Sequence, residues 1–214
     1  MESRSFKVSL AKNPLISIKV IPGHFTTSNA HSNFFLDVSW LKSNALAARD
    51  AARHLAIPYL ATTLIDTIVC MEKTEVIGAY MAEELVQEGP VVMNAGDELH
   101  VVSPMNSSQG NLIFPESVAE WIKNRSILLL VASISSGRTV HSALECLAYY
   151  GGKVAGISTL FLSSHEAMGE KINALFTSDD IPGYKLYAPG ECEMCRAGQK
   201  LDAIISSDGY TKIG

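Results

Sequence analysis

Short runs of apolar, often β-branched residues recur along the chain and predict buried β-strands. A strand covered on both faces needs apolar side chains at consecutive positions, so unbroken runs are typical of a parallel sheet. Residues 16–21 alternate only weakly between apolar and polar, which predicts an edge strand. The runs cover residues 64–70, 99–102, 127–131 and 154–162, and the longest stretch made only of hydrophobic residues is 127–132.

Helical periodicity fills the gaps between these runs. The apolar residues of segment 140–148 recur at a spacing that places them on one helix face, and Gly151 and Gly152 end that helix. Strand and helix therefore alternate, which predicts an α/β fold with a mostly parallel central sheet flanked by helices. Further helices are expected over residues 43–56, 77–85 and 165–175.

The chain of 214 residues is long enough for one domain with small additions at both ends. Residues 105–114 are polar and contain glycine, which predicts a loop or hairpin tip. From residue 178 onward the alternation gives way to short strands and turns. We therefore expect an N-terminal segment 1–60, a core 61–177 and a C-terminal extension 178–214.

Charge and hydropathy exclude several classes of partner. Lys and Arg number 17 against 22 Asp and Glu, a net charge of −5, and the basic residues form no stripe. This argues against nucleic-acid binding, which depends on neutralising phosphates. No apolar run approaches the roughly 20 residues that span a bilayer, and the first residues contain no apolar signal-peptide core. We expect a cytoplasmic protein that has no contact with membranes.

The strongest local signal for chemistry follows the apolar run 127–134. There the chain reads Ser135-Ser136-Gly137-Arg138-Thr139 and passes directly into the amphipathic helix. Backbone N–H groups at such a strand-to-helix turn bind anions, and the hydroxyl groups and Arg138 add donors. The alternative is an ordinary helix start capped by Ser or Thr.

Residues 134–139 (ISSGRT) resemble the phosphoribosyl-diphosphate (PRPP) loop of type I phosphoribosyltransferases, which holds the 5′-phosphate. Residues 192–198 (CEMCRAG) are similar to a C-P-x-C-K-x-G element of orotate phosphoribosyltransferases, and residues 25–37 (FTTSNAHSNFFLD) to their base-pocket segment. The three matches keep the family's order. The resemblance implies the type I phosphoribosyltransferase fold, a homodimer, and a base pocket in segment 1–60. That pocket would be lined by His31, Phe34 and Phe35, although one phenylalanine of such a pair often lies in the core.

Three departures from the family pattern fall on the part that binds the diphosphate and its metal. The acidic pair, the cations of the basic loop and the Gly pair of the diphosphate turn are all replaced by other residue types. Without the acidic pair nothing there accepts hydrogen bonds from the ribose hydroxyls, and Glu75 repels a diphosphate. The replaced positions are Val131 and Ala132 (acidic pair), Ser103, Pro104 and Ser107 (basic loop), and Thr74 and Glu75 (Gly pair).

Two functions remain in competition. One is an orotate phosphoribosyltransferase-like enzyme, which the overall match favours and which would need Mg²⁺ if it uses PRPP. The other is a non-catalytic relative that binds a nucleotide or phosphorylated sugar and has a regulatory role. Losing two charge-stabilising contacts of about 3 kcal/mol each lowers a rate by roughly 10⁴-fold, so the departures favour the second.

Cys192 and Cys195 form a single C-x-x-C pair. Zinc commonly takes four ligands, and Cys70, Cys146 and the histidines are far away in sequence. We therefore expect a turn that packs the C-terminal strands rather than a metal site, with redox chemistry as a third interpretation.

Overall fold

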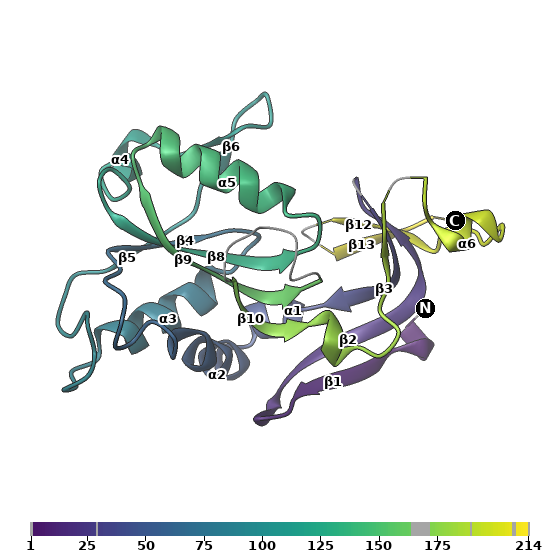
Figure 1. The fold of residues 1–214 in the computed structure, drawn as a ribbon, viewed down its shortest axis with the longest axis horizontal. Coiled ribbons are helices and arrows are strands. Elements are labelled where there is room, and N and C mark those ends of the chain that lie inside the picture. Colours follow the sequence, from purple (N-terminus) through teal and green to yellow (C-terminus); the bar gives the residue numbers. More distant parts are fainter. Residues whose placement is uncertain (1, 29, 164–171, 189, 207–208, 214) are drawn as a thin grey trace.

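The computed structural model describes residues 2–28, 30–163, 172–188, 190–206 and 209–213, and its centre is a parallel five-stranded sheet. All four pairings in this sheet are parallel, and Figure 1 shows helices on both of its faces. The predicted α/β fold with a mostly parallel sheet is confirmed. The strands, in spatial order, are β10 (Ile172–Thr177), β9 (Lys153–Leu162), β8 (Ser126–Ile134), β4 (Thr67–Cys70) and β5 (His100–Val102).

Strand β8 separates two layers of the core, because successive side chains point to opposite faces of a sheet. Leu128 and Leu130 pack with α2 (Ala45–Ala56) and α3 (Glu75–Val86). On the other face, Leu129 packs with α5 (Arg138–Tyr149). The unbroken apolar run predicted from the sequence is thus explained by burial on both sides. The remaining short helices are α1 (Ser39–Ser43), α4 (Glu116–Ala119), α6 (Glu193–Arg196), η1 (Glu2–Arg4) and η2 (Ser178–Asp180).

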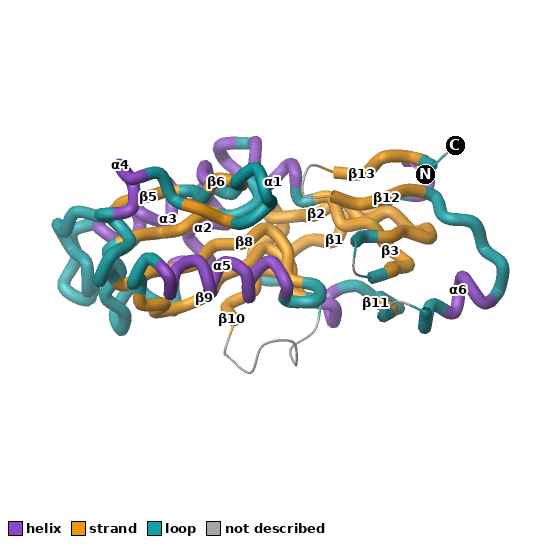
Figure 2. Tube along the Cα trace, turned by 90° about the horizontal axis from the view of Figure 1, so that it is seen from above, coloured by secondary structure: helices purple, strands orange, loops and turns teal. Residues whose placement is uncertain are grey.

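A second, mixed sheet lies at one end of the parallel sheet (Figures 1 and 2). Its long strand β2 pairs with neighbours on both sides, and within residues 16–21 both Lys19 and Val20 have partners in β1 and β3, so the prediction of an edge strand is wrong at these two positions. The weak alternation there has another cause: Ile16, Ile18 and Val20 are buried while the residues between them are partly exposed. The strands are β1 (Phe6–Leu10), β2 (Asn13–Thr26), β3 (His31–Asp37), β11 (Leu186–Tyr187), β12 (Ala203–Ser206) and β13 (Gly209–Lys212).

The predicted helix over residues 165–175 needs a correction. Residues 165–171 lie outside the described part of the chain, and residues 172–175 belong to strand β10, which runs parallel to β9. Short apolar runs fit helix and strand periods equally well, and burial of Phe176 within the sheet decides for the strand. The predicted hairpin tip is confirmed, since β6 (Met105–Asn106) and β7 (Leu112–Ile113) pair antiparallel.

The two ends of the chain meet on the second sheet. Strand β12 runs parallel to β2, with Ala203 beside Phe25. The Arg4 guanidinium lies 3.1 Å from the Asp202 carboxylate, and the Tyr210 hydroxyl donates to Glu2 at 2.6 Å. The C-terminal extension is therefore built into the N-terminal sheet. Within the described residues, no helix has the length and apolar character to cross a membrane.

Candidate functional site

The predicted anion loop lies at the carboxyl end of β8, where it lines a cavity of about 180 Å³. Gly137 has φ +76° and ψ −5°, a left-handed conformation that glycine adopts without strain, and it turns the chain into α5. Helix bonding begins with the His141 N–H, which donates to the Gly137 carbonyl at 2.9 Å. The N–H groups of the preceding first turn have no partner within the helix and carry its positive dipole end. The five predicted residues that line this cavity are Ser135, Ser136, Gly137, Arg138 and Thr139.

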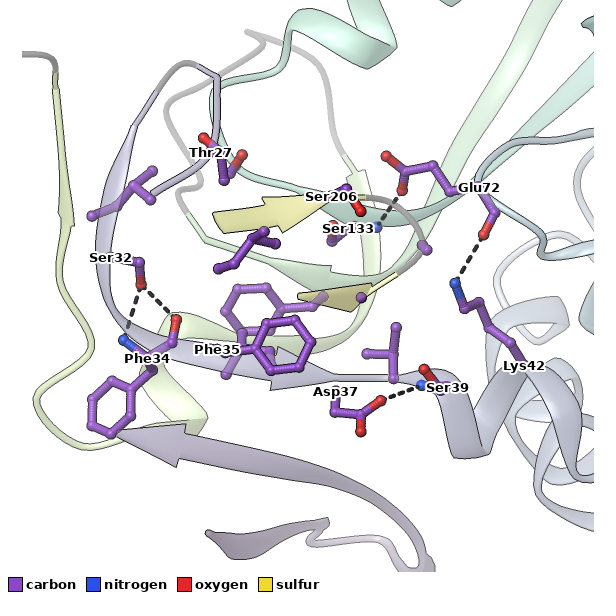
Figure 3. Close-up of a pocket in the computed structure, with 18 of the residues that line it drawn as sticks. Thr27, Ser32, Phe34, Phe35, Asp37, Ser39, Lys42, Glu72, Ser133 and Ser206 are labelled. Carbon is purple, nitrogen blue, oxygen red and sulfur yellow. Dashed lines mark hydrogen bonds between the residues drawn. The ribbon is translucent and has the colours of Figure 1, made fainter. Parts of the chain in front are cut away.

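The opposite wall of this cavity comes from the second sheet. Thr27 and Ser28 follow strand β2, and Ser206 ends strand β12. The wall therefore combines segments almost 180 residues apart in sequence, which is why sequence reasoning missed it. This wall also carries hydroxyl groups, including those of Thr27 and Ser206 (Figure 3), and they suit an oxygen-rich ligand.

A second cavity, of about 120 Å³, continues from the first. The two share six lining residues, so they form one cleft. The wall of the second cavity is mainly apolar, with Phe34, Phe35, Phe161 and Tyr184 among its residues. A hydroxyl-rich pocket thus opens into an aromatic one. The shared residues are Thr27, Glu72, Ser133, Ser135, Ile205 and Ser206.

The aromatic side chains of this wall hold one another in place. The Phe34 ring is nearly parallel to that of Tyr184, with centroids 6.4 Å apart, and Tyr184 meets Phe161 edge-on at 5.4 Å. Phe35 is 6 % exposed and packs against Tyr210. Burial raises the pKa of Tyr184 above its ordinary value, so its hydroxyl stays protonated. Tyr184 had no sequence signal beyond its place after a turn.

His31, predicted to line the base pocket, lies elsewhere. Among the described residues that line the two cavities, Phe34 and Phe35 are present and His31 is not. Its Nδ1 lies 3.1 Å from Nε2 of His24 and 3.3 Å from Sγ of Cys195. The imidazole therefore faces the C-terminal segment rather than the cleft.

Glu72 lines both cavities, and Figure 3 shows its hydrogen bonds with Ser133 and Lys42. Its Oε2 accepts a hydrogen bond from the Ser133 backbone N–H at 3.1 Å, and its carbonyl accepts one from Lys42 Nζ at 3.0 Å. Glu72 and Lys73 both have left-handed backbones, with φ of 56° and 64°, a conformation that side-chain-bearing residues rarely adopt. Such strain is often found at functional sites, and here it aims a carboxylate into the cleft.

Burial raises the pKa of Glu72, and this predicts a pH-dependent stability. A raised folded-state pKa favours folding below the ordinary carboxyl pKa of 4.5, and this contribution is lost as the pH rises through the folded value. Glu72→Gln should therefore raise Tm relative to the unsubstituted chain at pH 7, with a difference that fades below pH 4.5. Thermal denaturation across this range measures it, with the exposed Glu88→Gln as control. A lower Tm for Glu72→Gln at pH 7 would contradict the prediction.

The positions that depart from the family pattern have ordinary structural partners. Val131 is fully buried against α5, while Ala132 lines the aromatic cavity. The Thr74 hydroxyl donates to the Met71 carbonyl at 2.9 Å. Of the other four positions, Glu75 is the first residue of α3, and the remaining three lie around the β6–β7 hairpin. There the Ser103 hydroxyl donates to Glu75 at 2.7 Å, Ser107 accepts the Asn111 N–H at 3.1 Å, and Pro104 precedes β6.

The chain is similar to known proteins in sequence and in fold. No family model matches the chain. An orotate phosphoribosyltransferase of Sulfurimonas denitrificans is 23% identical over 197 residues, which are 85% of this chain and 90% of that protein. A UMP synthase of Leishmania donovani superposes with a TM-score of 0.54 at 20% identity, over 74% of this chain. This chain covers 33% of that protein's length.

A second solved structure agrees in fold. The orotate phosphoribosyltransferase of Mycobacterium tuberculosis superposes with a TM-score of 0.51 at 14% identity, covering 75% of this chain and 90% of that one. The sequence match and both superpositions agree with the resemblance drawn from residues 25–37, 134–139 and 192–198. The chain has the type I phosphoribosyltransferase fold, and its sequence is similar to that of an orotate phosphoribosyltransferase.

Proposed function

We propose that this protein binds a nucleoside monophosphate without transferring its phosphoribosyl group. The observation that carries the proposal is the continuous cleft, in which a hydroxyl-lined pocket at a helix N-terminus opens into an aromatic pocket. A phosphate fits the first pocket, where the N–H groups of the Ser135–Thr139 loop and Arg138 meet it. A base fits the second pocket, beside the Phe34–Tyr184 pair.

Glu72 is the group best placed to bind the ribose between them. Its carboxylate lies at the junction of the two pockets and accepts hydrogen bonds. In this proposal it takes over the hydrogen bonding that Val131 and Ala132 lack. The same carboxylate disfavours a diphosphate, because it adds negative charge where PRPP would carry its own.

Phosphoribosyl transfer needs cations that stabilise the departing diphosphate, and the aligned loop of this chain has none. Residues 100–115 contain no Lys or Arg, so the aligned basic loop offers no side-chain cation to a departing diphosphate. Two missing contacts of about 3 kcal/mol each correspond to roughly 10⁴-fold in rate. We therefore propose a binding protein with a regulatory role, in the cytoplasm and as a homodimer.

The second candidate is orotate phosphoribosyltransferase activity. It is favoured by the similarity to the Sulfurimonas denitrificans enzyme, which extends over 90% of that protein's length. In this case Mg²⁺ would accompany PRPP, and Lys42 is a cation of the cleft wall that could meet the diphosphate.

One set of measurements separates the two functions. We expect calorimetric titration to give saturable binding of orotidine or uridine monophosphate and at least tenfold weaker binding of PRPP with Mg²⁺. Orotate absorbance should stay constant when orotate, PRPP and Mg²⁺ are added together. Steady consumption of orotate would overturn the proposal in favour of the enzyme. Absence of monophosphate binding would overturn the assignment of the cleft.

A further inference from the structure

Two histidines and two cysteines converge at one end of the second sheet, and none of the four is among the described residues that line the cleft. His24 lies on β2, His31 begins β3, Cys192 precedes α6 and Cys195 lies within it. One potential ligand atom from each residue lies within 4.8 Å of those of the other three. Figures 1 and 2 show α6 at this end of the molecule, beyond the strands of the second sheet. The cysteines approach histidines as many as 171 residues away in sequence.

The distances between these atoms are those of a tetrahedron around a metal. His24 Nε2 lies 3.1 Å from His31 Nδ1, 3.4 Å from Cys192 Sγ and 3.5 Å from Cys195 Sγ, and Cys195 Sγ lies 3.3 Å from His31 Nδ1. Zinc bonds of about 2.0–2.1 Å to nitrogen and 2.3 Å to sulfur give tetrahedron edges of about 3.3–3.8 Å. The four measured edges agree with this geometry to within about 0.3 Å.

Hydrogen bonding alone leaves this arrangement poorly satisfied. The His24 Nδ1 lies 2.9 Å from the Gln199 carbonyl, which can only accept a hydrogen bond, so in the neutral imidazole the ring lone pair is on Nε2. Three groups lie around Nε2, namely His31 Nδ1 and the sulfur atoms of Cys192 and Cys195. One lone pair can accept a well-aligned hydrogen bond from only one of them. His24 is fully buried, so water does not compensate. A cation at the centre would use the lone pairs of all four groups at once.

The surroundings of His24 match those of a metal ligand. A carbonyl that accepts the other ring N–H fixes the tautomer and orientation of a metal-bound histidine. The His24 backbone is held as well, because its N–H donates to Asp202 at 2.9 Å. A Cβ at Gly23 would come within 2.7 Å of the same carboxylate, so glycine permits this close approach.

We propose that His24, His31, Cys192 and Cys195 form a structural zinc site. Two thiolates and two imidazoles are a donor set that selects Zn²⁺, and four protein ligands leave no open position for catalysis. Binding displaces the protons of the two thiols, and the resulting site ties the β2–β3 hairpin to the C-terminal segment. The proposal is independent of the nucleotide-binding cleft.

The test uses the full chain, purified under reducing conditions without chelator and without a metal-affinity column. Elemental analysis should find about one zinc per chain. Cys195→Ser should lower this at least tenfold, whereas the control Cys146→Ser should retain it. Cys146 is a buried thiol outside the cluster, and serine can still donate to the Leu112 carbonyl that Cys146 contacts.

Two measurements on the unsubstituted chain keep the test independent of how the variants fold. A strong chelator should lower Tm by about 5 °C or more, and added Zn²⁺ should restore it. Cobalt in place of zinc should show the intense visible absorption of a tetrahedral site together with thiolate-to-cobalt charge transfer. A chain that holds no zinc and shows no Tm shift on adding Zn²⁺ would overturn the proposal. A Cys192–Cys195 disulfide in the metal-free protein as isolated would also overturn it.

Discussion

Replacing Gly137 with aspartate is expected to weaken nucleoside monophosphate binding by about 100-fold or more. The left-handed backbone at φ +76° costs a side-chain-bearing residue roughly 1 kcal/mol or more, and this strain distorts the turn into α5. The new carboxylate also lies beside the phosphate and repels it. About 3 kcal/mol in total corresponds to roughly two orders of magnitude in Kd. Calorimetric titration with uridine monophosphate measures the change.

Gly96→Asp is the matched control. Gly96 has φ +75°, and a Cβ built there meets nothing within 4 Å, so the substitution adds the same strain and charge. It lies in the loop before β5, at the opposite end of the parallel strands from the Ser135–Thr139 loop. We expect it to leave Kd unchanged. Equal Kd values for Gly137→Asp and the control would show that the loop does not hold the phosphate.

Introducing an acidic residue at the first position of the family's acidic pair should destabilise the fold. Val131 is fully buried between β8 and α5, among residues such as Leu129 and Leu147. Aspartate has nearly the volume of valine, so Val131→Asp chiefly adds a buried charge without a partner. We expect the free energy of unfolding to fall by about 3–5 kcal/mol, as judged by urea denaturation at pH 7. The loss should shrink at low pH, where the carboxyl group is protonated.

The variant Val131→Thr shows how much of the lost free energy of unfolding comes from a buried polar group and how much from a buried charge. Threonine keeps the branched shape and adds a hydroxyl group, so it should cost only about 1–3 kcal/mol and show no such pH dependence. If Val131→Asp were as stable as Val131→Thr at pH 7, the carboxylate would have found solvent or a cation. The packing described for β8 would then be wrong.

Much of the fold could be predicted because a strand that is buried on both faces has apolar residues at consecutive positions. The run 127–131 lies within β8, and the periodic residues 140–148 lie within α5. The failures have one physical origin: where a segment is short or half-buried, its local pattern fits more than one structure. That is why residues 16–21 suggested an edge strand and residues 172–175 a helix.

The candidate site also has a part that could be predicted from the sequence and a part that could not. The Ser135–Thr139 loop is contiguous, so its strand, turn and helix could be predicted from one stretch of sequence. Tyr184 and Ser206 come from distant segments, and only the folded chain places them beside that loop. The His24–His31–Cys192–Cys195 cluster gives no complete metal-site signal in any short segment for the same reason, because its histidines and cysteines come from opposite ends of the chain.

The pairing of β12 with β2 has a consequence for the order in which the protein matures. The parallel sheet and its helices draw on residues 45–177, which can fold while later residues are still being synthesised. The cleft also requires Ile205, Ser206 and Gly209, so its wall closes only after those residues leave the ribosome. A nascent chain thus has an ordered α/β core well before it has a place for ligand. Under the proposed function, a nucleotide would bind only chains that have completed this last step.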